Sequence, residues 1–285
     1  MAELDSNSGQ PGLADPPAGV WEELGVVPEV EVHGGFQSRV FLARRRSDRL
    51  IVKLVEAGDA DADAVLRDRV DLIRRLAEIN PSVVGPLTLG AESVVAVDRW
   101  NAVCYPYVEG TRPDTGDRLD VEAMAATLGA LHDSLAALPN PGLPPVAALG
   151  GSGEVFWGEP QLIHGDYAAS NLILTGSGLK VIDFDECGQG SIEFEIGNTL
   201  YMVLFDAWRC GAVDRYNRFR SWFVAGYQRA TSVAIEDSGL DSAIRIRAAA
   251  LERWLATPAE APTGIRASSQ EWREQLRRFV DEVLS

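Results

Sequence analysis

The stretch His164-Gly165-Asp166-Tyr167-Ala168-Ala169-Ser170-Asn171, followed by Val181-Ile182-Asp183-Phe184-Asp185, decides the fold of this chain. Apolar residues flank both segments, which predicts that each lies at the end of a short strand. Residues 175–178 combine Thr and Ser with two Gly and predict a turn, so the strands form a hairpin. We expect this hairpin to hold Asp166, Asn171 and Asp183 close together on a rigid base.

These three side chains supply carboxylate and amide oxygens, which bind hard cations such as Mg²⁺ or accept protons. Phosphoryl transfer requires such oxygen ligands and proton acceptors, because its catalysis depends on positioning and charge neutralisation more than on covalent chemistry by the protein. The alternative is that Asp and Asn simply favour the turns of a hairpin. Turn chemistry does not explain the whole set, so the pattern favours a phosphoryl-transfer site.

The order H-G-D-x-x-x-x-N followed by I-D-F-D resembles the aminoglycoside phosphotransferase and choline kinase branch of the protein-kinase-like fold. Protein kinases have Arg at the position of Gly165 and D-F-G in place of D-F-D, so the small-molecule branch is favoured. The resemblance implies an α+β, bilobal fold, with a small antiparallel-sheet N-lobe and a larger, mainly helical C-lobe. It implies a nucleotide-binding N-lobe with its hinge at 20–110 and a catalytic and substrate-binding helical C-lobe at 111–285. Residues 1–19 are polar and rich in Pro and Gly, which predicts a disordered tail.

The resemblance also implies a role for each residue of the motif. Asp166 would be the catalytic base that accepts the proton of a substrate hydroxyl, or orients that hydroxyl. Asn171 and Asp183 would hold the Mg²⁺ ions that bridge the phosphates of ATP. His164 is expected to hold the catalytic loop, and Glu195, where the family usually has Asp, to brace it.

The segment Leu50-Ile51-Val52-Lys53-Leu54-Val55 predicts an apolar strand that contains a single lysine. A lysine in such a strand is costly to bury without an anionic partner. Lys53 resembles the kinase lysine that contacts the α- and β-phosphates, whereas the alternative is a surface lysine on a half-exposed strand.

Two further N-lobe features follow from the same resemblance. Residues 32–42 predict strand, turn and strand where the family has its phosphate-covering loop, with Gly35 and Ser38 as candidate phosphate contacts. Residues 61–79 predict an amphipathic helix. Its Asp68, or Asp71 as second choice, is expected to pair with Lys53, although both are shorter than the usual Glu; an exposed helical Asp is the alternative.

Residues 105–110 are predicted to form the hinge, and the resemblance places adenine against them. Tyr105 would border the adenine pocket, the Pro106 carbonyl would accept from the exocyclic amine, and the Val108 amide would donate to the ring. Pro106 has no amide hydrogen, which does not matter if only its carbonyl is used. The alternative is an ordinary strand end followed by a proline-containing turn.

For the acceptor, we expect recognition by acids beside the motif, Asp185 and Glu186. Acids of the last helices are equally compatible with a solvated face. Acidic residues outnumber basic ones by 42 to 26, a formal net charge of −16. This charge disfavours nucleic acid and favours a cationic small molecule, although it also serves solubility.

The chain has neither a signal-peptide pattern nor an apolar run of the roughly 20 residues that span a membrane, so no membrane association is expected. Its three cysteines, Cys104, Cys187 and Cys210, lack metal-ligand spacing, which favours a cytoplasmic protein. Monomer and homodimer are both compatible with the sequence.

Together these observations predict an ATP- and Mg²⁺-dependent kinase for a hydroxyl of a cationic, amino-bearing small molecule, foremost an aminoglycoside or related antibiotic. One alternative is a metabolic kinase for choline, homoserine or a fructosamine-like substrate. Another is a nucleotide-binding pseudokinase, against which the intact Lys53, Asp166, Asn171 and Asp183 argue. The sequence leaves open whether GTP replaces ATP.

Overall fold

The computed structural model of the chain describes residues 16, 18–32, 38–146, 160–257 and 268–285. Its N-terminal lobe contains a five-stranded antiparallel sheet with the strand order β1-β2-β3-β5-β4. The strands are β1 (Val27–Val32), β2 (Arg39–Arg45), β3 (Asp48–Glu56), β4 (Val95–Val97) and β5 (Trp100–Pro106). Helices α1 (Ala18–Leu24) and α2 (Ala60–Ile79) complete this lobe.

The two faces of this sheet differ in burial. Alternate residues such as Phe41 and Val52 are buried in a cluster with Val20 and Leu24 of α1. The opposite face carries Lys53, because residues directly paired across strands share a face and Lys53 lies opposite Val40 and Val103. Towards β1 this second face is apolar but open.

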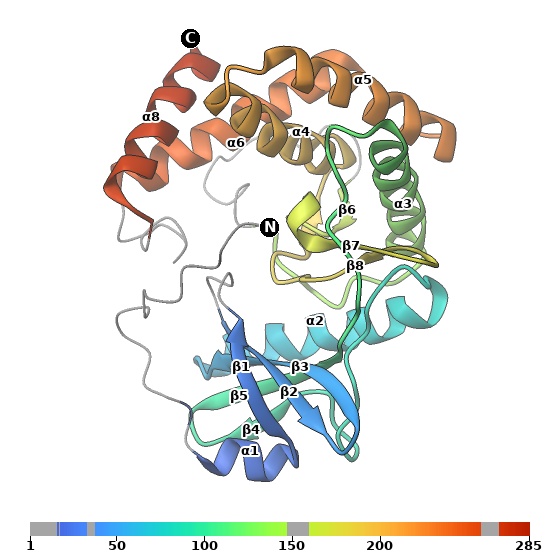
Figure 1. Cartoon of the computed structure of the whole chain (residues 1–285), viewed down its shortest axis with the longest axis vertical. Helices are drawn as coiled ribbons and strands as arrows, with labels where there is room; N and C mark the ends of the chain where they lie inside the picture. The colour runs from blue at the N-terminus through green and yellow to red at the C-terminus, as the bar shows by residue number, and fades with distance from the viewer. Residues whose placement is uncertain (1–15, 17, 33–37, 147–159, 258–267) are drawn as a thin grey trace.

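Helix α2 lies between the sheet and the helical lobe (Figure 1). Asp59 caps its N-terminus, where the carboxylate accepts a hydrogen bond from Ala62 N at 2.9 Å. Leu72, Ile73 and Leu76 are buried in the core of the helical lobe. The helix thereby fixes the position of the sheet relative to the site below it.

The C-terminal lobe consists of two short strand pairs and a set of helices. Strand β6 (Gln161–Ile163) pairs with β9 (Gly188–Gly190), and β7 (Leu172–Thr175) pairs with β8 (Gly178–Val181). A short 3₁₀ helix covers Ala169–Asn171. The helices are α3 (Arg118–Ala136), α4 (Ile192–Arg209), α5 (Val213–Ala230), α6 (Asp237–Ala256) and α8 (Gln270–Leu284).

This arrangement confirms the predicted α+β architecture with a small antiparallel-sheet lobe and a larger helical lobe. The expected lobe boundary at 110/111 falls in the segment between β5 and α3. Of the expected tail, residues 1–15 and 17 lie outside the described residues, whereas Ala18 and Gly19 begin α1. Among the described helices, none combines the length and apolar character needed to cross a membrane.

Candidate active site

The catalytic-loop segment places Asp166 and Asn171 in direct contact. The Asn171 side-chain amide donates to Asp166 Oδ2 at 2.9 Å and to the Asp166 carbonyl at 2.8 Å. Both bonds use Nδ2, and among the described residues Asn171 Oδ1 accepts no hydrogen bond. One side chain therefore orients the candidate base and presents an oxygen that can bind a cation.

His164 joins this loop to the strand that ends before Asp183. Its Nε2 lies 3.0 Å from the Ile182 carbonyl, which can only accept, so Nε2 carries a proton. Its Nδ1 lies 3.3 Å from Asp166 N, which can only donate, so Nδ1 is an acceptor. The neutral Nε2–H tautomer satisfies both contacts, and the buried ring packs on Phe184 with centroids 4.4 Å apart.

Gly165 allows the loop to approach the segment after Asp183. Its φ is +85°, and a Cβ atom there would lie 2.2 Å from the Glu186 carbonyl oxygen. Any other residue would combine an unfavourable backbone conformation with a clash against rigid backbone. This explains in physical terms why glycine stands where protein kinases have Arg.

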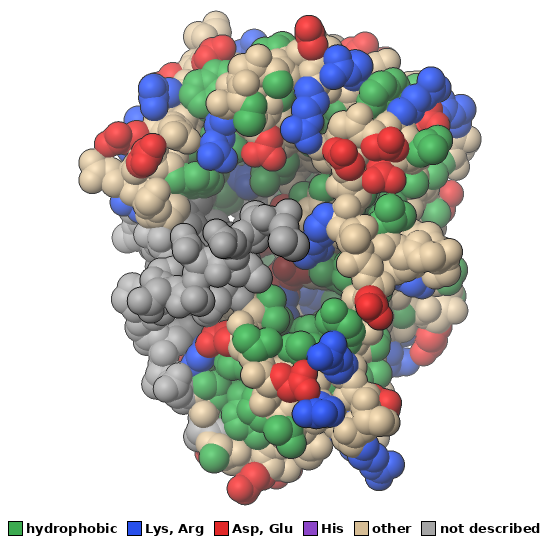
Figure 2. Space-filling model, in the orientation of Figure 1, with side chains coloured by type: hydrophobic (Ala, Val, Ile, Leu, Met, Phe, Trp, Pro, Cys, Tyr) green, Lys and Arg blue, Asp and Glu red, His purple; other side chains and the backbone are tan. Residues whose placement is uncertain are grey.

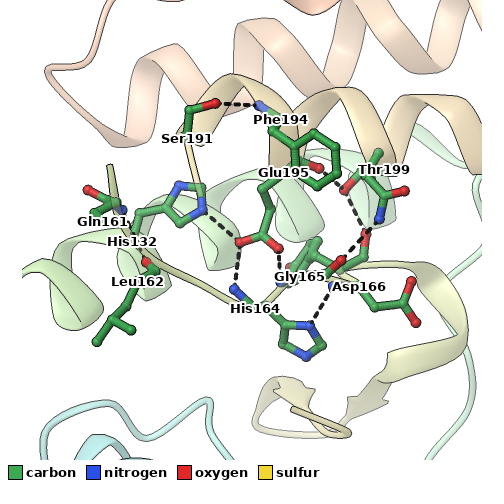
Figure 3. A network of polar contacts seen from close by, with 12 residues as sticks. His132, Gln161, Leu162, His164, Gly165, Asp166, Ser191, Phe194, Glu195 and Thr199 are labelled. Atoms are coloured by element: carbon green, nitrogen blue, oxygen red, sulfur yellow. Dashed lines mark hydrogen bonds and ion pairs between the residues drawn. The ribbon is translucent and has the colours of Figure 1, made fainter. Parts of the chain in front are cut away.

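Glu195 braces the loop from α4, as Figure 3 shows. Its carboxylate accepts from Gly165 N at 2.6 Å, from His164 N at 2.8 Å and from His132 Nε2 at 3.0 Å. Burial raises the pKa of the Glu195 carboxyl, but hydrogen bonds from His132 and the His164 amide lower it by more. The side chain, although fully buried, therefore stays ionised.

Two neighbours on the same face of α4 extend this brace, and the sequence analysis missed both. Thr199 Oγ1 donates to the Tyr167 carbonyl at 2.6 Å, and Asn198 Nδ2 donates to the Gly165 carbonyl at 3.4 Å. Positions 195, 198 and 199 share one face because residues three and four apart are neighbours on a helix. Polar residues at this spacing in an otherwise apolar helix were the signal available in the sequence.

Lys53 reaches into the site from the sheet above. Its side chain is 11% exposed, and Nζ lies 2.7 Å from Asp183 Oδ1 and 2.5 Å from Asp185 Oδ1. Burial lowers the pKa of Lys53, but the charges of Asp185 and Asp183 raise it by more. Burial likewise raises the pKa of Asp183, while Lys53 lowers it by more, so the pair is ionised.

The expected pairing of Lys53 with Asp68 is corrected by this geometry. Asp68 is exposed on α2, and Asp71, the second choice, pairs with Arg74 and Arg75. The neighbouring Arg69 faces the motif instead, and its Nε donates to the Cys187 carbonyl at 3.2 Å. Among the described residues, the partners of Lys53 come from the D-F-D segment itself.

The two acids expected at the acceptor have different surroundings. Asp185 faces Lys53, so the structure places it at the lysine as well as beside the motif. Glu186 is half-buried, and its backbone packs against Gly165 of the catalytic loop. Asp183 adopts a φ of +64°, a left-handed conformation that costs energy outside glycine and is often found at functional sites.

The phosphate-covering loop is only partly described. Ser38 is buried immediately before β2, two residues from Val40, which lies opposite Lys53. Gly35 lies outside the described residues. The structure therefore brings Ser38 to the same end of the sheet as Lys53 and gives no placement for Gly35.

The end of the hinge is held against β7 by backbone hydrogen bonds. Thr111 and Leu174 exchange two backbone hydrogen bonds, with N···O distances of 3.1 and 2.7 Å. A Cβ on Gly110 would lie 2.3 Å from the Leu174 carbonyl oxygen, so only glycine fits this approach. The close contact fixes where the preceding hinge residues meet the helical lobe.

The residues expected around adenine have distinct positions. Tyr105 shares the Lys53 face of the sheet, since it lies opposite Ile51, and burial raises its phenol pKa. Pro106 ends β5 and is exposed, and Val108 N has no recorded hydrogen bond within the part of the chain that the structure describes. The surface between the lobes is hollowed, with acidic and basic side chains inside the hollow (Figure 2).

Solved structures with a similar fold include an amicoumacin kinase in complex with AMP-PNP and Ca²⁺, at a TM-score of 0.73 and 14% identity over 95% of this chain and 93% of that one. A spectinomycin phosphotransferase with ADP and spectinomycin gives 0.61 and 14% over 96% and 98%. Choline kinase from Cryptosporidium parvum gives 0.58 and 12% over 91% and 88%. A search of the curated proteins found no match.

These likenesses confirm the predicted bilobal, protein-kinase-like fold. At the level of sequence, the model of the phosphotransferase enzyme family matches residues 29–153 and 156–232. The matched residues make up more than half of the chain's 285 and contain Lys53, Asp166, Asn171 and Asp183. The chain therefore belongs to the phosphotransferase enzyme family.

Proposed function

We propose that the enzyme transfers the γ-phosphoryl group of ATP to a hydroxyl group of a small molecule. The observation that carries this proposal is the cluster of Lys53, Asp166, Asn171 and Asp183, with Lys53 bound to Asp183 and Asn171 bound to Asp166. An ionised lysine, an oriented carboxylate and free oxygen ligands are the groups that phosphoryl transfer requires.

The nucleotide would lie between the sheet and β7. The open part of the Lys53 face is apolar, with Val30 and Val32 exposed by 55% and 44%, which suits the flat, apolar faces of adenine. Pro106 and Val108 would offer the hinge carbonyl and amide to the ring edge, and Tyr105 would border the pocket. Lys53, Ser38 and Gly35 would contact the phosphates.

A divalent cation fits the oxygen donors of this site. The Asn171 side-chain oxygen and the Asp183 carboxylate match the preference of Mg²⁺ for one or two protein ligands beside substrate phosphates. Mg²⁺ would neutralise the phosphate charge during transfer. Lys53, which pairs with Asp183 and Asp185 here, would exchange part of that pairing for the phosphates.

Asp166 would then act on the acceptor. The acceptor oxygen attacks the γ-phosphorus, the bond to the β-phosphate oxygen breaks to release ADP, and the hydroxyl proton passes to Asp166. Asn171 would keep the carboxylate oriented, and Glu195 would hold the loop that carries it.

We propose a cationic, amino-bearing acceptor, most specifically an aminoglycoside or related antibiotic. The net charge of −16 and the acids Asp185 and Glu186 beside the catalytic loop support this class. The fold likeness to choline kinase keeps a metabolic kinase as the second candidate. A pseudokinase is disfavoured because the four residues of the cluster are intact. A cytoplasmic location and a monomeric or dimeric state remain predictions.

The test is ADP release by the purified enzyme with Mg-ATP across aminoglycosides, cyclic peptide antibiotics, choline, homoserine and fructosamines. Stimulation by a cationic antibiotic supports the first candidate, and stimulation only by a metabolite supports the second. Asp166→Asn should lower turnover by about 10²–10⁴-fold while ATP binding persists. Asp133→Asn, an exposed change on α3, is the matched control. Near-normal turnover of Asp166→Asn would refute the proposed role of the base.

A further inference from the structure

Arg112 lies in the segment that joins the hinge to α3 and belongs to no motif. Its Nη1 donates to the Leu172 carbonyl at 3.0 Å. Leu172 immediately follows Asn171, the candidate cation ligand. A residue from the hinge side is thereby held beside the loop that carries the proposed chemistry.

The geometry of β7 defines the direction in which Arg112 runs. Backbone groups two residues apart point to the same edge of a strand. Leu174 uses this edge to bond Thr111, and the Leu172 carbonyl on the same edge accepts from Arg112. The side chain therefore runs from the hinge towards Asn171 along the edge of β7 that is not paired with β8.

The positive charge of Arg112 itself suits an anionic ligand. Arg112 is exposed; partial desolvation lowers its pKa, and the negative charge of Asp183, which lies within electrostatic reach, raises it by less. A guanidinium stays protonated at neutral pH. Its contact with Leu172 uses one of five N–H groups, and no other hydrogen bond of Arg112 is recorded within the described ranges.

We propose that Arg112 binds the phosphate chain of the nucleotide and acts as a second cationic contact beside Lys53. This inference rests on the proposed use of ATP. Lys53 contacts Asp183 from the sheet, whereas Arg112 contacts the Leu172 carbonyl beside Asn171, so the two cations reach the motif from different elements. In a protein with a net charge of −16, ATP needs such local cations to bind.

The alternative ligand is an anionic group on the acceptor. The placement favours the nucleotide, because the hinge, where adenine is proposed to bind, ends two residues before Arg112, and the intervening Thr111 is hydrogen-bonded to the same strand. A ribose hydroxyl is a further possible partner, but it would not need a full positive charge. The three partners are distinguished by which ligand loses affinity when Arg112 is replaced.

The experiment is calorimetric titration of wild-type enzyme, Arg112→Gln and Arg112→Lys with Mg-ATP, Mg-ADP and adenosine, together with acceptor KM values. We expect Arg112→Gln to weaken ATP and ADP by about tenfold or more, the usual effect of losing one charge-assisted contact. Adenosine affinity should stay within about twofold and thereby shows that the pocket remains folded. Arg112→Lys, which keeps the charge but loses the planar fork, should fall between the two.

Arg118→Gln, an exposed change at the start of α3, is the matched control and should bind all three ligands as the wild type does. Unchanged ATP and ADP affinity in Arg112→Gln would overturn the inference alone. Equal losses for adenosine and ADP would assign Arg112 to the ribose, and a change confined to the acceptor KM would assign it to the acceptor; either result overturns the inference. A wild-type enzyme that binds no ATP or ADP would overturn the proposed function as well.

Discussion

Asp185 provides the sharpest test at the scale of single residues, because it pairs with Lys53, a role that the sequence analysis assigned to an acid of α2. Its carboxylate lies 2.5 Å from Lys53 Nζ, whereas Asp68 is exposed. We predict that Asp185→Asn lowers the free energy of unfolding by about 1.5–3 kcal/mol, the range for a hydrogen bond to a charged group. The KM for ATP should also rise, because Lys53 loses part of its positioning.

Asp68→Asn is the matched control for this prediction, since it makes the same chemical change at the residue favoured by the family pattern. It should leave both quantities unchanged. Urea unfolding and steady-state kinetics of the two variants measure the difference. Equal effects at the two positions would show that α2 supplies the partner of Lys53 after all.

At the scale of elements, the catalytic loop depends on the close approach of two backbones at Gly165. A Cβ there would lie 2.2 Å from the Glu186 carbonyl oxygen, and φ is +85°. We predict that Gly165→Ala displaces the loop, lowers turnover at least tenfold and costs about 1–3 kcal/mol of stability. Gly176→Ala, in the β7–β8 turn with no atom within 4 Å of its Cβ, should be close to neutral. Similar activities of the two variants would contradict the prediction.

The brace from α4 to this loop makes a second prediction at the same scale. Glu195 accepts from three N–H groups, and a glutamine would turn its own NH₂ towards one of them. We expect Glu195→Gln to lower the unfolding free energy by about 3 kcal/mol at neutral pH, with Glu193→Gln on the same helix as control. Urea unfolding at several pH values measures the effect.

The pH dependence of this effect follows from the direction of the pKa shift. The pKa of Glu195 is lowered in the folded state relative to the unfolded chain. Its contribution to stability is therefore fully present above the ordinary Glu pKa of about 4.3 and is lost as the pH falls through the lowered folded value. The difference between wild type and Glu195→Gln should shrink over that range. A constant difference would mean that the charge of Glu195 does not stabilise the fold.

At the scale of the whole molecule, the sequence predicted those elements whose formation depends on nearby residues. The hairpin that carries Asn171 and Asp183, the helix at 61–79 and the lysine strand follow from apolar periodicity and turn residues. The partners of Lys53 could not be predicted in this way, because Asp183 and Asp185 lie 130 and 132 residues after Lys53 in the chain. Which acid comes closest to the lysine depends on how α2 packs. Arg112 was missed for the same reason, since its contact is with a backbone carbonyl that carries no sequence signal.

The net charge of −16 makes a prediction for the whole molecule as well. An acidic surface raises the local concentration of a cationic acceptor, and salt screens this attraction beyond a Debye length of about 10 Å at 0.1 M. With Mg-ATP saturating, kcat/KM for a cationic acceptor should fall several-fold between about 0.02 and 0.2 M KCl, whereas that of an uncharged acceptor should change little. Steady-state kinetics at fixed pH measure both. If the cationic acceptor is as insensitive to salt as the neutral one, the surface charge serves solubility rather than substrate capture, and acceptor selection lies in short-range contacts such as those proposed for Glu186.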